Sequence, residues 1–411
     1  MSKRLGMFVS HPIQYFSPLW RSLAAEPGLS VRVHFFSDHS VRGGNDADFK
    51  VPVAWDVPLL EGYDHSFLSR SAHLSRPLSV GIAEARSVLR EGQFDWVMVH
   101  GYTYRFETQV IRAAWRLGIP VLLRGELTDA RPYHTVWYRR LLRDRYLKWF
   151  YRHVDRFCYI GANARRHLLR LGVNEDRMFF SPYSVDSALF EEQSRRFDRE
   201  SCRRELGIAP EQLVLLFSGK FIPRKAPLLL LEAITQLSNR EKLTLIMLGD
   251  GELRPEIEAR ALKVLGGRVI IPGFVNQTQL GRYFRAADVF VLPSVYETWG
   301  LVVNEAMHFR LPAIVSSGVG CAPDLIRDGE TGRVFAVGDA RELAECLDAF
   351  VHSPERAGIM GGVAGEHIRR YSTEASTAGI LQALGQYKDD GGLHPGASQV
   401  REGRPSRNAD E

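Results

Sequence analysis

Short, continuous apolar runs alternate along the chain with longer stretches of mixed apolar and polar residues. The runs at residues 5–10, 96–99 and 157–160 are typical of strands that are buried on both faces. The segment 31–37 is also predicted as a strand, although Arg32 and His34 interrupt its apolar residues. A second series of the same kind begins at Val214. Because strands that alternate with helices form right-handed βαβ units, each series predicts a doubly wound parallel sheet. The pattern therefore predicts an α/β protein with two such domains.

The boundary between the two series is expected near residue 190, because the segment that follows is rich in Arg and Glu and contains no strand pattern. The last residues are polar and rich in glycine, which is typical of a disordered segment. The expected order is a first domain at 1–189, a second domain at 190–362 that begins with a helical linker at 190–212, a helix at 363–387 that packs back on the first domain, and a disordered tail at 388–411.

The segment 288–307 combines an apolar strand, a loop and the start of a helix. Gly300 precedes the helical run LVVNEAMHF, and a helix N-terminus offers free N–H groups and a positive dipole end that can bind phosphate. Glu297 lies in the loop. Glu305 lies on an apolar helix face, where a charge is costly unless it is paired or hydrogen-bonded. A structural Arg or the hydroxyl groups of a sugar can be that partner, and the segment alone does not decide between them.

The stretch Glu297-Thr-Trp-Gly-Leu-Val-Val-Asn-Glu305 resembles the Glu-x(7)-Glu motif of the family four retaining glycosyltransferases. The resemblance implies the GT-B fold, in which two Rossmann-like domains face each other across a cleft. It also implies transfer of a sugar from a nucleotide diphosphate-sugar donor to an acceptor hydroxyl, with retention of configuration. In that family the residue matching Glu305 holds the ribose hydroxyls, and the residue matching Glu297 holds the donor sugar.

A basic loop follows the strand at 214–218. It reads Gly219-Lys220-Phe-Ile-Pro-Arg224-Lys225-Ala-Pro, so two lysines can lie beside a diphosphate and Gly219 allows a ligand close to the backbone. The resembled family has Gly-Arg-Leu-x-x-x-Lys-Gly here, with the Arg and the Lys on the leaving diphosphate. Lys220 keeps the charge of that Arg but not its bidentate geometry, which Arg224 is placed to supply. We predict Lys220 and Lys225 as catalytic residues, together with Glu297.

By the same resemblance, Val275 lies beside the nucleotide base, and Gly300 and Leu301 lie at the phosphate-binding helix N-terminus. We expect no cofactor besides the donor substrate and no metal, because the lysines and the helix N-terminus can carry the charge of the leaving group. Asp46 and Asp48 form a DxD triplet of the kind that binds manganese in the other large glycosyltransferase fold. No strand leads directly into this triplet, so we favour a solvated loop.

Four polar residues of the first domain follow predicted strands. His11, His100, Arg124 and Glu126 lie at carboxyl ends of strands, which is where parallel sheets bind ligands. Each of them alone is more often a structural residue, but together they line one edge of one sheet, and in the resembled family this edge faces the acceptor. In the resembled family a His often lies where His100 does, so we add His100 to the catalytic candidates. The Gly-Gly pair common in the family's first loop is absent here, where the chain reads His-Pro-Ile-Gln from His11.

Positive charge is concentrated in the first half of a chain whose formal net charge is +5, which indicates an anionic partner. Residues 137–153 hold six Lys and Arg among aromatic residues, with Asp144 as the one acid. A helix of this kind can lie on an anionic membrane. The alternative is an ordinary domain helix whose Leu141, Leu142, Leu147 and Phe150 face the core. No nucleic-acid module accompanies the charge, so nucleic acid is not an expected partner.

No apolar run approaches the roughly 18 residues that span a bilayer, and the first residues do not resemble a signal peptide. The four cysteines are far apart in the sequence and form no CxxC pair, which favours a reducing compartment. We therefore expect a cytoplasmic protein, peripheral on the inner face of the membrane. A lipid-linked or envelope glycan is the expected acceptor.

Two other classes of function stay open. A sugar-nucleotide epimerase can share this fold and would need acid–base residues across the cleft, for which His11 and His100 are candidates. A non-catalytic binding module would keep the nucleotide pocket but lose Lys220 or Glu297, and the chain retains both.

Overall fold

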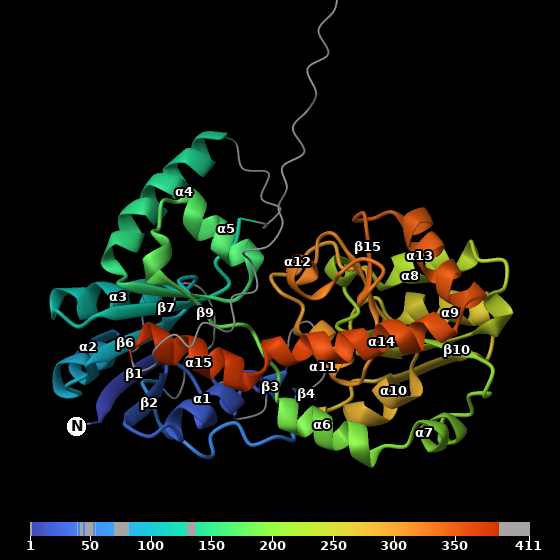
Figure 1. Cartoon of the computed structure of the whole chain (residues 1–411), viewed down its shortest axis with the longest axis horizontal. Helices are drawn as coiled ribbons and strands as arrows, with labels where there is room; N and C mark the ends of the chain where they lie inside the picture. Colours follow the sequence, from blue (N-terminus) through green and yellow to red (C-terminus); the bar gives the residue numbers. More distant parts are fainter. Residues whose placement is uncertain are drawn as a thin grey trace, which may run out of the picture.

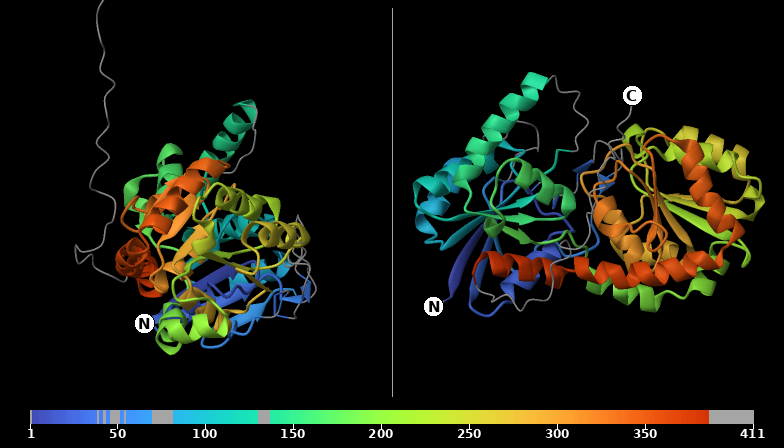
Figure 2. Two further views of the ribbon diagram at one scale, coloured as in Figure 1. Left: turned by 90° about the vertical axis from the view of Figure 1, so that its right-hand side faces the viewer. Right: turned by 45° about the horizontal axis from the view of Figure 1, so that its top comes forward.

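The computed structural model consists of two parallel sheets, each flanked by helices, that lie one beside the other along the long axis of the molecule (Figures 1 and 2). The predicted fold class is thereby confirmed. The structure describes residues 2–38, 40–41, 44–45, 52–53, 55–69, 82–129 and 137–385. The DxD triplet and the predicted tail at 388–411 lie outside these residues.

The first sheet has seven strands in the order β5-β2-β1-β6-β7-β8-β9, all paired in parallel. The strands are β1 (Lys3–Val9), β2 (Leu29–Phe35), β5 (Asp64–Phe67), β6 (Trp96–His100), β7 (Val121–Gly125), β8 (Arg156–Tyr159) and β9 (Met178–Phe180). The helices of this domain are α1 (Ser17–Ala24), α2 (Ile82–Glu91), α3 (Arg105–Arg116), α4 (Trp137–Phe150) and α5 (Ala162–Arg170). The apolar runs predicted every strand except β5 and β9. The sequence of β5, DHSF, has little apolar character, and none of its four residues is buried at this edge of the sheet, so no apolar run marks the strand.

The second sheet has six parallel strands in the order β12-β11-β10-β13-β14-β15. The strands are β10 (Leu213–Ser218), β11 (Leu243–Leu248), β12 (Val269–Gly273), β13 (Val289–Leu292), β14 (Ala313–Ser316) and β15 (Gly332–Phe335). The helices around it are α8 (Pro227–Thr235), α9 (Arg254–Leu265), α10 (Leu280–Ala286), α11 (Leu301–His308), α12 (Ala322–Leu325) and α13 (Ala340–His352).

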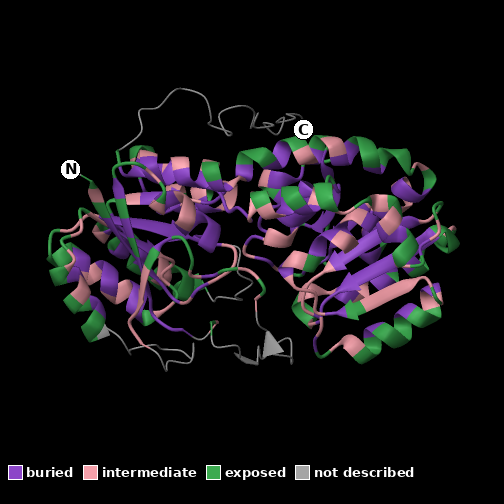
Figure 3. Ribbon diagram, turned by 90° about the horizontal axis from the view of Figure 1, so that it is seen from below, coloured by how far each residue is buried: buried purple, intermediate pink, exposed green. Residues whose placement is uncertain are grey.

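Both sheets form the cores of their domains. The central strands β6, β7, β10 and β13 are apolar and buried over nearly their whole length (Figure 3). Burial on both faces explains why these strands read as continuous apolar runs and not as alternating patterns. The four cysteines are buried and free.

Helices carry the chain between the domains in both directions. α6 (Ser187–Arg196) and α7 (Arg199–Glu205) lead into the second domain, at the predicted helical linker. α14 (Glu355–Ile368) leads back, and α15 (Thr373–Ala383) packs on β8, β9 and α1 of the first domain. The single helix predicted at 363–387 is wrong, because the side chain of Ser372 caps the N-terminus of α15 and separates it from α14.

Short antiparallel strands, β3 (Gly44–Asn45) and β4 (Pro52–Val53), precede and follow the DxD triplet in the sequence, where the sequence analysis favours a solvated loop. Within the described ranges, no helix is both long enough and apolar enough to cross a membrane.

Candidate active site

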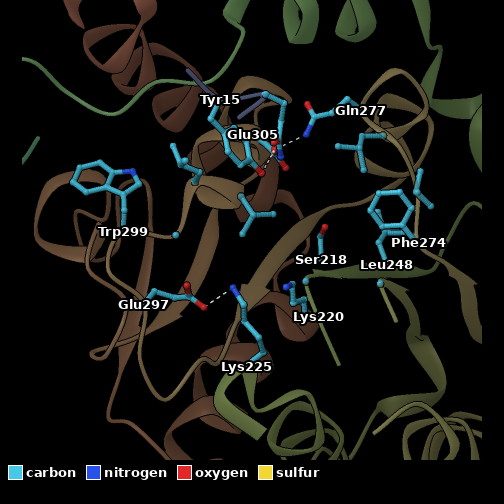
Figure 4. Close-up of a pocket in the computed structure, with 18 of the residues that line it drawn as sticks. Tyr15, Ser218, Lys220, Lys225, Leu248, Phe274, Gln277, Glu297, Trp299 and Glu305 are labelled. Atoms are coloured by element: carbon cyan, nitrogen blue, oxygen red, sulfur yellow. Dashed lines mark hydrogen bonds and ion pairs between the residues drawn. The ribbon is translucent and has the colours of Figure 1, made fainter. Parts of the chain in front are cut away.

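A cavity of about 390 Å³ lies where loops at the carboxyl ends of both sheets meet (Figure 4). The second domain contributes most of its wall. All nine residues predicted to be donor-binding or catalytic in that domain line the cavity: Gly219, Lys220, Arg224, Lys225, Val275, Glu297, Gly300, Leu301 and Glu305. The first domain contributes Gln14, Tyr15, Trp55 and Glu126. The tertiary structure therefore brings residues separated by up to about 290 positions into one site.

The start of α11 is one wall of this cavity. Gly300 has a φ of +99° and precedes the first helical residue, Leu301, as the sequence predicts. A Cβ at Gly300 would lie 3.1 Å from Val319 Cγ1, and the left-handed backbone there favours glycine in any case. The free N–H groups of this helix N-terminus are thus placed beside the cavity, where they can bind an anionic group.

The carboxylate of Glu297 is paired with the basic loop after β10. Lys225 Nζ lies 2.5 Å from Glu297 Oε1, and Ser294 Oγ donates to the same oxygen at 3.0 Å. Arg224 Nη1 lies 3.5 Å from Oε2. Because Glu297 is only 8% exposed, these partners offset the cost of burying its charge. The pairing also fixes the position of Lys225, which is held at the cavity wall (Figure 4).

Lys220 lines the same end of the cavity, where the loop after β10 packs directly against the loop after β11. A Cβ at Gly249 would lie 2.0 Å from the carbonyl oxygen of Gly219, so this contact requires glycine at position 249. The close packing presents Lys220, Arg224 and Lys225 on one wall. Three cations beside a helix N-terminus form an environment suited to a diphosphate.

Glu305 lies at the opposite end of the cavity and is almost completely buried. Tyr15 donates its hydroxyl hydrogen to Glu305 Oε1 at 3.0 Å, and Gln277 Nε2 approaches the same oxygen at 3.4 Å. Burial raises the pKa of Glu305 to about 7, although both hydrogen bonds act to lower it. The sequence left a structural Arg or a ligand hydroxyl as the partner. The structure shows a third solution, the hydroxyl of a tyrosine from the other domain.

The ligand-free protein is expected to be more stable at alkaline pH when Glu305 is replaced with Gln. A carboxyl whose folded-state pKa is raised stabilises the fold only while protonated, and this contribution is lost as the pH rises through about 7. A rise from 4.5 to about 7 corresponds to about 3 kcal/mol at pH 8.5. Thermal unfolding of Glu305→Gln should therefore show a higher Tm than the wild type at pH 8.5 and a similar Tm at pH 5.

The exposed Glu256 on α9 provides the control, because Glu256→Gln should leave the Tm unchanged at both pH values. A Glu305→Gln protein that is less stable than the wild type at pH 8.5 would show that the carboxylate is stabilised by its partners more than burial destabilises it.

Only some of the residues predicted on the acceptor side line the cavity. Glu126 lines the cavity, whereas His11, His100 and Arg124 are not part of its wall. His11 Nδ1 lies 3.0 Å from Ser10 Oγ. His100 Nε2 lies 3.1 Å from the Tyr183 hydroxyl, and burial lowers the pKa of His100 well below its usual value. The ring of His100 is therefore neutral at physiological pH, and it packs against the rings of Phe16 and Tyr183.

Arg124 is a correction to the prediction of an acceptor-side residue. Its side chain is 1% exposed and donates to Ser181 Oγ, the Pro182 carbonyl and Ser376 Oγ, each at 3.0 Å. These bonds tie β7 to the segment that leaves the first domain and to α15. Arg124 satisfies buried polar groups in the fold and does not face the cavity.

Gln14, Tyr15, Trp55, Phe274, Gln277 and Trp299 also line the cavity, and the sequence analysis did not single them out. Tyr15 lies four residues after His11 in a loop that was already recognised as following a strand. That position was the one signal available for it. Among the described residues, no group of three or more His, Cys, Asp and Glu side chains is placed to hold a metal ion.

Family models match both halves of the chain. Residues 12–184 match a model described as Glycosyl transferase 4-like domain, and residues 198–365 match one described as Glycosyl transferases group 1. A relative, D-inositol 3-phosphate glycosyltransferase 2 of Catenulispora acidiphila, is 32% identical over 251 residues, which cover 58% of this chain and 57% of the relative. The chain thus aligns with about half the length of the relatives it matches.

Solved structures of similar architecture cover almost the whole chain. The structure of Anabaena Alr3699/HepE in complex with UDP and glucose has a TM-score of 0.69 and 15% identity, covering 94% of this chain and 100% of that one. Sucrose-phosphate synthase from Thermosynechococcus elongatus has a TM-score of 0.68 and 20% identity, covering 93% and 98%. At sequence identities this low, the similarity shows the fold alone. The fold is GT-B, and the chain belongs to the glycosyl transferases group 1 family.

Proposed function

We propose that the protein transfers a sugar from a nucleotide diphosphate-sugar to an acceptor hydroxyl, with retention and without a metal ion. The observation that carries the proposal is one cavity that is lined by three cations, by a helix N-terminus and by the buried Glu305. A nucleotide diphosphate has the matching polarity, with hydroxyl donors on its ribose and two phosphates next to it.

In the proposed reaction, Glu305 accepts hydrogen bonds from the ribose hydroxyls. Lys220, Lys225 and the N-terminus of α11 stabilise the negative charge that develops on the leaving diphosphate. Glu297, held by Lys225 at 2.5 Å, lies beside the donor sugar. The acceptor enters from the first domain, on the side of Glu126. Retention rests on membership of the family, and no residue of this site is assigned as a covalent nucleophile.

The proposal is tested by measuring the release of nucleotide diphosphate. The substrates are a panel of UDP- and GDP-sugars, each with and without candidate acceptors. A transferase releases the diphosphate in an acceptor-dependent manner and forms a glycoside of the same anomeric configuration as the donor. An epimerase would change the sugar while the total of sugar nucleotide stays constant. A binding module would do neither, so either of these results would overturn the proposal.

Turnover is expected to continue in the presence of EDTA. The expected charge stabilisation comes from side chains and backbone N–H groups, which a chelator does not remove. Initial rates measured with and without EDTA should agree within about twofold. A rate that EDTA abolishes and Mn²⁺ restores would contradict metal independence and would direct attention to Asp46 and Asp48.

The protein is further proposed to act at an anionic membrane surface in the cytoplasm, on a lipid-linked or envelope glycan acceptor. Support comes from α4, which projects from the first domain (Figure 1) and in which only Leu147 and Phe150 are buried. Trp137, Leu141 and Leu142 are 76%, 54% and 64% exposed. The alternative reading, an ordinary domain helix, is wrong for Leu141 and Leu142, whereas Leu147 and Phe150 are buried as it predicts. A helix that exposes apolar and basic side chains together matches the interface of an anionic bilayer.

Charged contacts hold the helix at a defined position on the domain. Asp129 is contacted by Arg143 at 2.5 Å and by Arg170 at 2.7 Å, and Asp144 on α4 pairs with Arg170 at 2.5 Å. These contacts fix one side of α4 and leave Arg139, Arg140 and Arg145 exposed. The exposed arginines are therefore available to lipid headgroups.

We expect the wild-type protein to co-sediment with anionic vesicles and not with neutral vesicles. Each basic residue near the surface contributes about 1 kcal/mol, so Arg139/Arg140/Arg145→Glu should abolish binding at physiological salt. The control, Arg260→Glu on α9, alters an exposed charge in the other domain and should retain binding. Equal partition onto both kinds of vesicle, or no effect of the triple variant, would contradict a membrane role for α4.

A further inference from the structure

Tyr15 reaches across from the first domain to the nucleoside end of the cavity. It lies in the loop between β1 and α1, and its hydroxyl donates to Glu305 Oε1 at 3.0 Å (Figure 4). Gln277 approaches the same oxygen. Among the described residues, both hydrogen bonds to the Glu305 carboxylate are accepted by Oε1. Oε2 is therefore available to a ligand in the cavity that Glu305 and Tyr15 both line.

Other contacts close the same end of the cavity around Tyr15. The Thr278 N–H donates to the Asp56 carboxylate at 3.2 Å, and the Asp56 N–H donates to Asn276 Oδ1 at 3.4 Å. The rings of Trp55 and Phe274 meet edge to face, with centroids 6.1 Å apart. Loops of the first domain thus rest on residues 274–278, next to the position proposed for the nucleotide base.

We propose that Tyr15 is a positioning residue of the donor site, whose hydroxyl holds the Glu305 carboxylate in the orientation that accepts the ribose hydroxyls. The nucleoside end of the site is then built from both domains, with Glu305 supplied by the second and Tyr15 by the first. The inference rests on the proposed function, since it needs a nucleotide in this cavity.

The hydroxyl of Tyr15 favours the ionised form of Glu305. Burial opposes ionisation, and the hydrogen bonds from Tyr15 and Gln277 counteract that effect. Burial and the nearby Glu305 charge raise the pKa of Tyr15 well above its usual value, so Tyr15 stays a donor at every physiological pH. The other charged groups of the cavity are Glu126, Glu297, Lys220, Arg224 and Lys225. Of these groups, Glu297 also raises the pKa of Tyr15, as Glu305 does.

The opposite arrangement is a tyrosine that occupies the place of the ribose and must be displaced by the nucleotide. The two arrangements predict opposite signs for the effect of removing the hydroxyl. A positioning residue loses nucleotide affinity when it becomes Phe, whereas an obstructing residue gains affinity.

Calorimetric titration with UDP and with GDP between pH 6.5 and pH 8.5 distinguishes them. Tyr15→Phe is expected to bind the preferred nucleotide about tenfold more weakly at pH 7, the effect of one hydrogen bond to a charged group. Affinity of the wild type should fall as the pH drops through about 7, because the ribose hydroxyls bind the carboxylate better than the acid. In Tyr15→Phe this fall should occur at a higher pH, so the difference from the wild type shrinks at pH 8.5.

Two further variants give the experiment its controls. Glu305→Gln removes the titration of the carboxyl and leaves only the pH dependence that comes from the terminal phosphate of the nucleotide. Tyr63→Phe removes another buried tyrosine hydroxyl of the first domain, which bonds to the Leu59 carbonyl away from the cavity, and should match the wild type.

Equal or tighter binding by Tyr15→Phe, or a pH profile that does not move, would overturn the role of Tyr15. These results would leave the proposed function intact. If neither UDP nor GDP binds the wild type, the nucleotide site itself is contradicted, and the inference falls with it. A circular dichroism spectrum of Tyr15→Phe that matches the wild type shows that the comparison is between folded proteins.

Discussion

Replacing Lys225 with Ala is expected to lower kcat between about a hundredfold and a thousandfold, the range found when one group that stabilises transition-state charge is removed. Lys225 is held at the cavity wall by an ion pair of 2.5 Å with Glu297. Charge on the leaving diphosphate grows as the bond to the sugar breaks, so the loss should appear in kcat more than in KM. Steady-state kinetics of diphosphate release measures both quantities.

A matched control is Lys263→Ala, which removes an exposed lysine from α9 in the same domain. It should keep both kinetic constants within about twofold of the wild type. Loss of activity through KM alone in Lys225→Ala would assign this lysine to ground-state binding of the donor, contrary to the role proposed here.

Replacing Glu297 with Gln is expected to lower kcat by about a hundredfold or more while the affinity for free nucleotide diphosphate changes less than about threefold. Glu297 is proposed to contact the donor sugar. A free nucleotide diphosphate lacks this sugar, so its affinity should depend little on the Glu297 carboxylate. Glu305→Ala should show the opposite division, with nucleotide affinity reduced at least tenfold through loss of a hydrogen-bonded charged group. Calorimetry with the free nucleotide, combined with kinetics, separates the two variants.

Equal losses of nucleotide affinity in both glutamate variants would contradict this division of roles. The double variant Lys225→Ala/Glu297→Gln provides a second check. Because the two side chains are in direct contact, their effects on kcat should combine to less than the product of the single effects. Full independence would show that the ion pair has no part in catalysis.

The sequence predicted the wall that the second domain contributes to the cavity. Lys220 and Lys225 follow β10 within one loop, and Glu297 and Gly300 follow β13 within another. β10 and β13 are neighbours in the sheet and run in parallel. The family resemblance grouped these residues, and the structure gives the physical reason, because two neighbouring strands with the same direction place their loops at the same edge.

The sequence did not predict which residues of the first domain reach that wall. His100 is the last residue of β6 and Arg124 is the second-last of β7, so both lie at carboxyl ends of strands as expected. Their side chains, however, contact Tyr183 and the pair Ser181 and Ser376. Position at a strand end does not determine the direction of a side chain. That direction depended on partners from the crossover segment and from α15, which no spacing rule connects to β6 or β7.

By itself, the sequence determined the two parallel sheets, the basic loop and the start of α11, since each follows from patterns within about twenty residues. Only the tertiary structure decided the partner of Glu305, which is a tyrosine 290 positions away, and the exposure of Leu141 and Leu142 on α4. The physical reason is the same for both. Hydrophobic periodicity specifies which residues are able to be buried, whereas the surface that buries them, or leaves them exposed, exists only after distant segments have packed together.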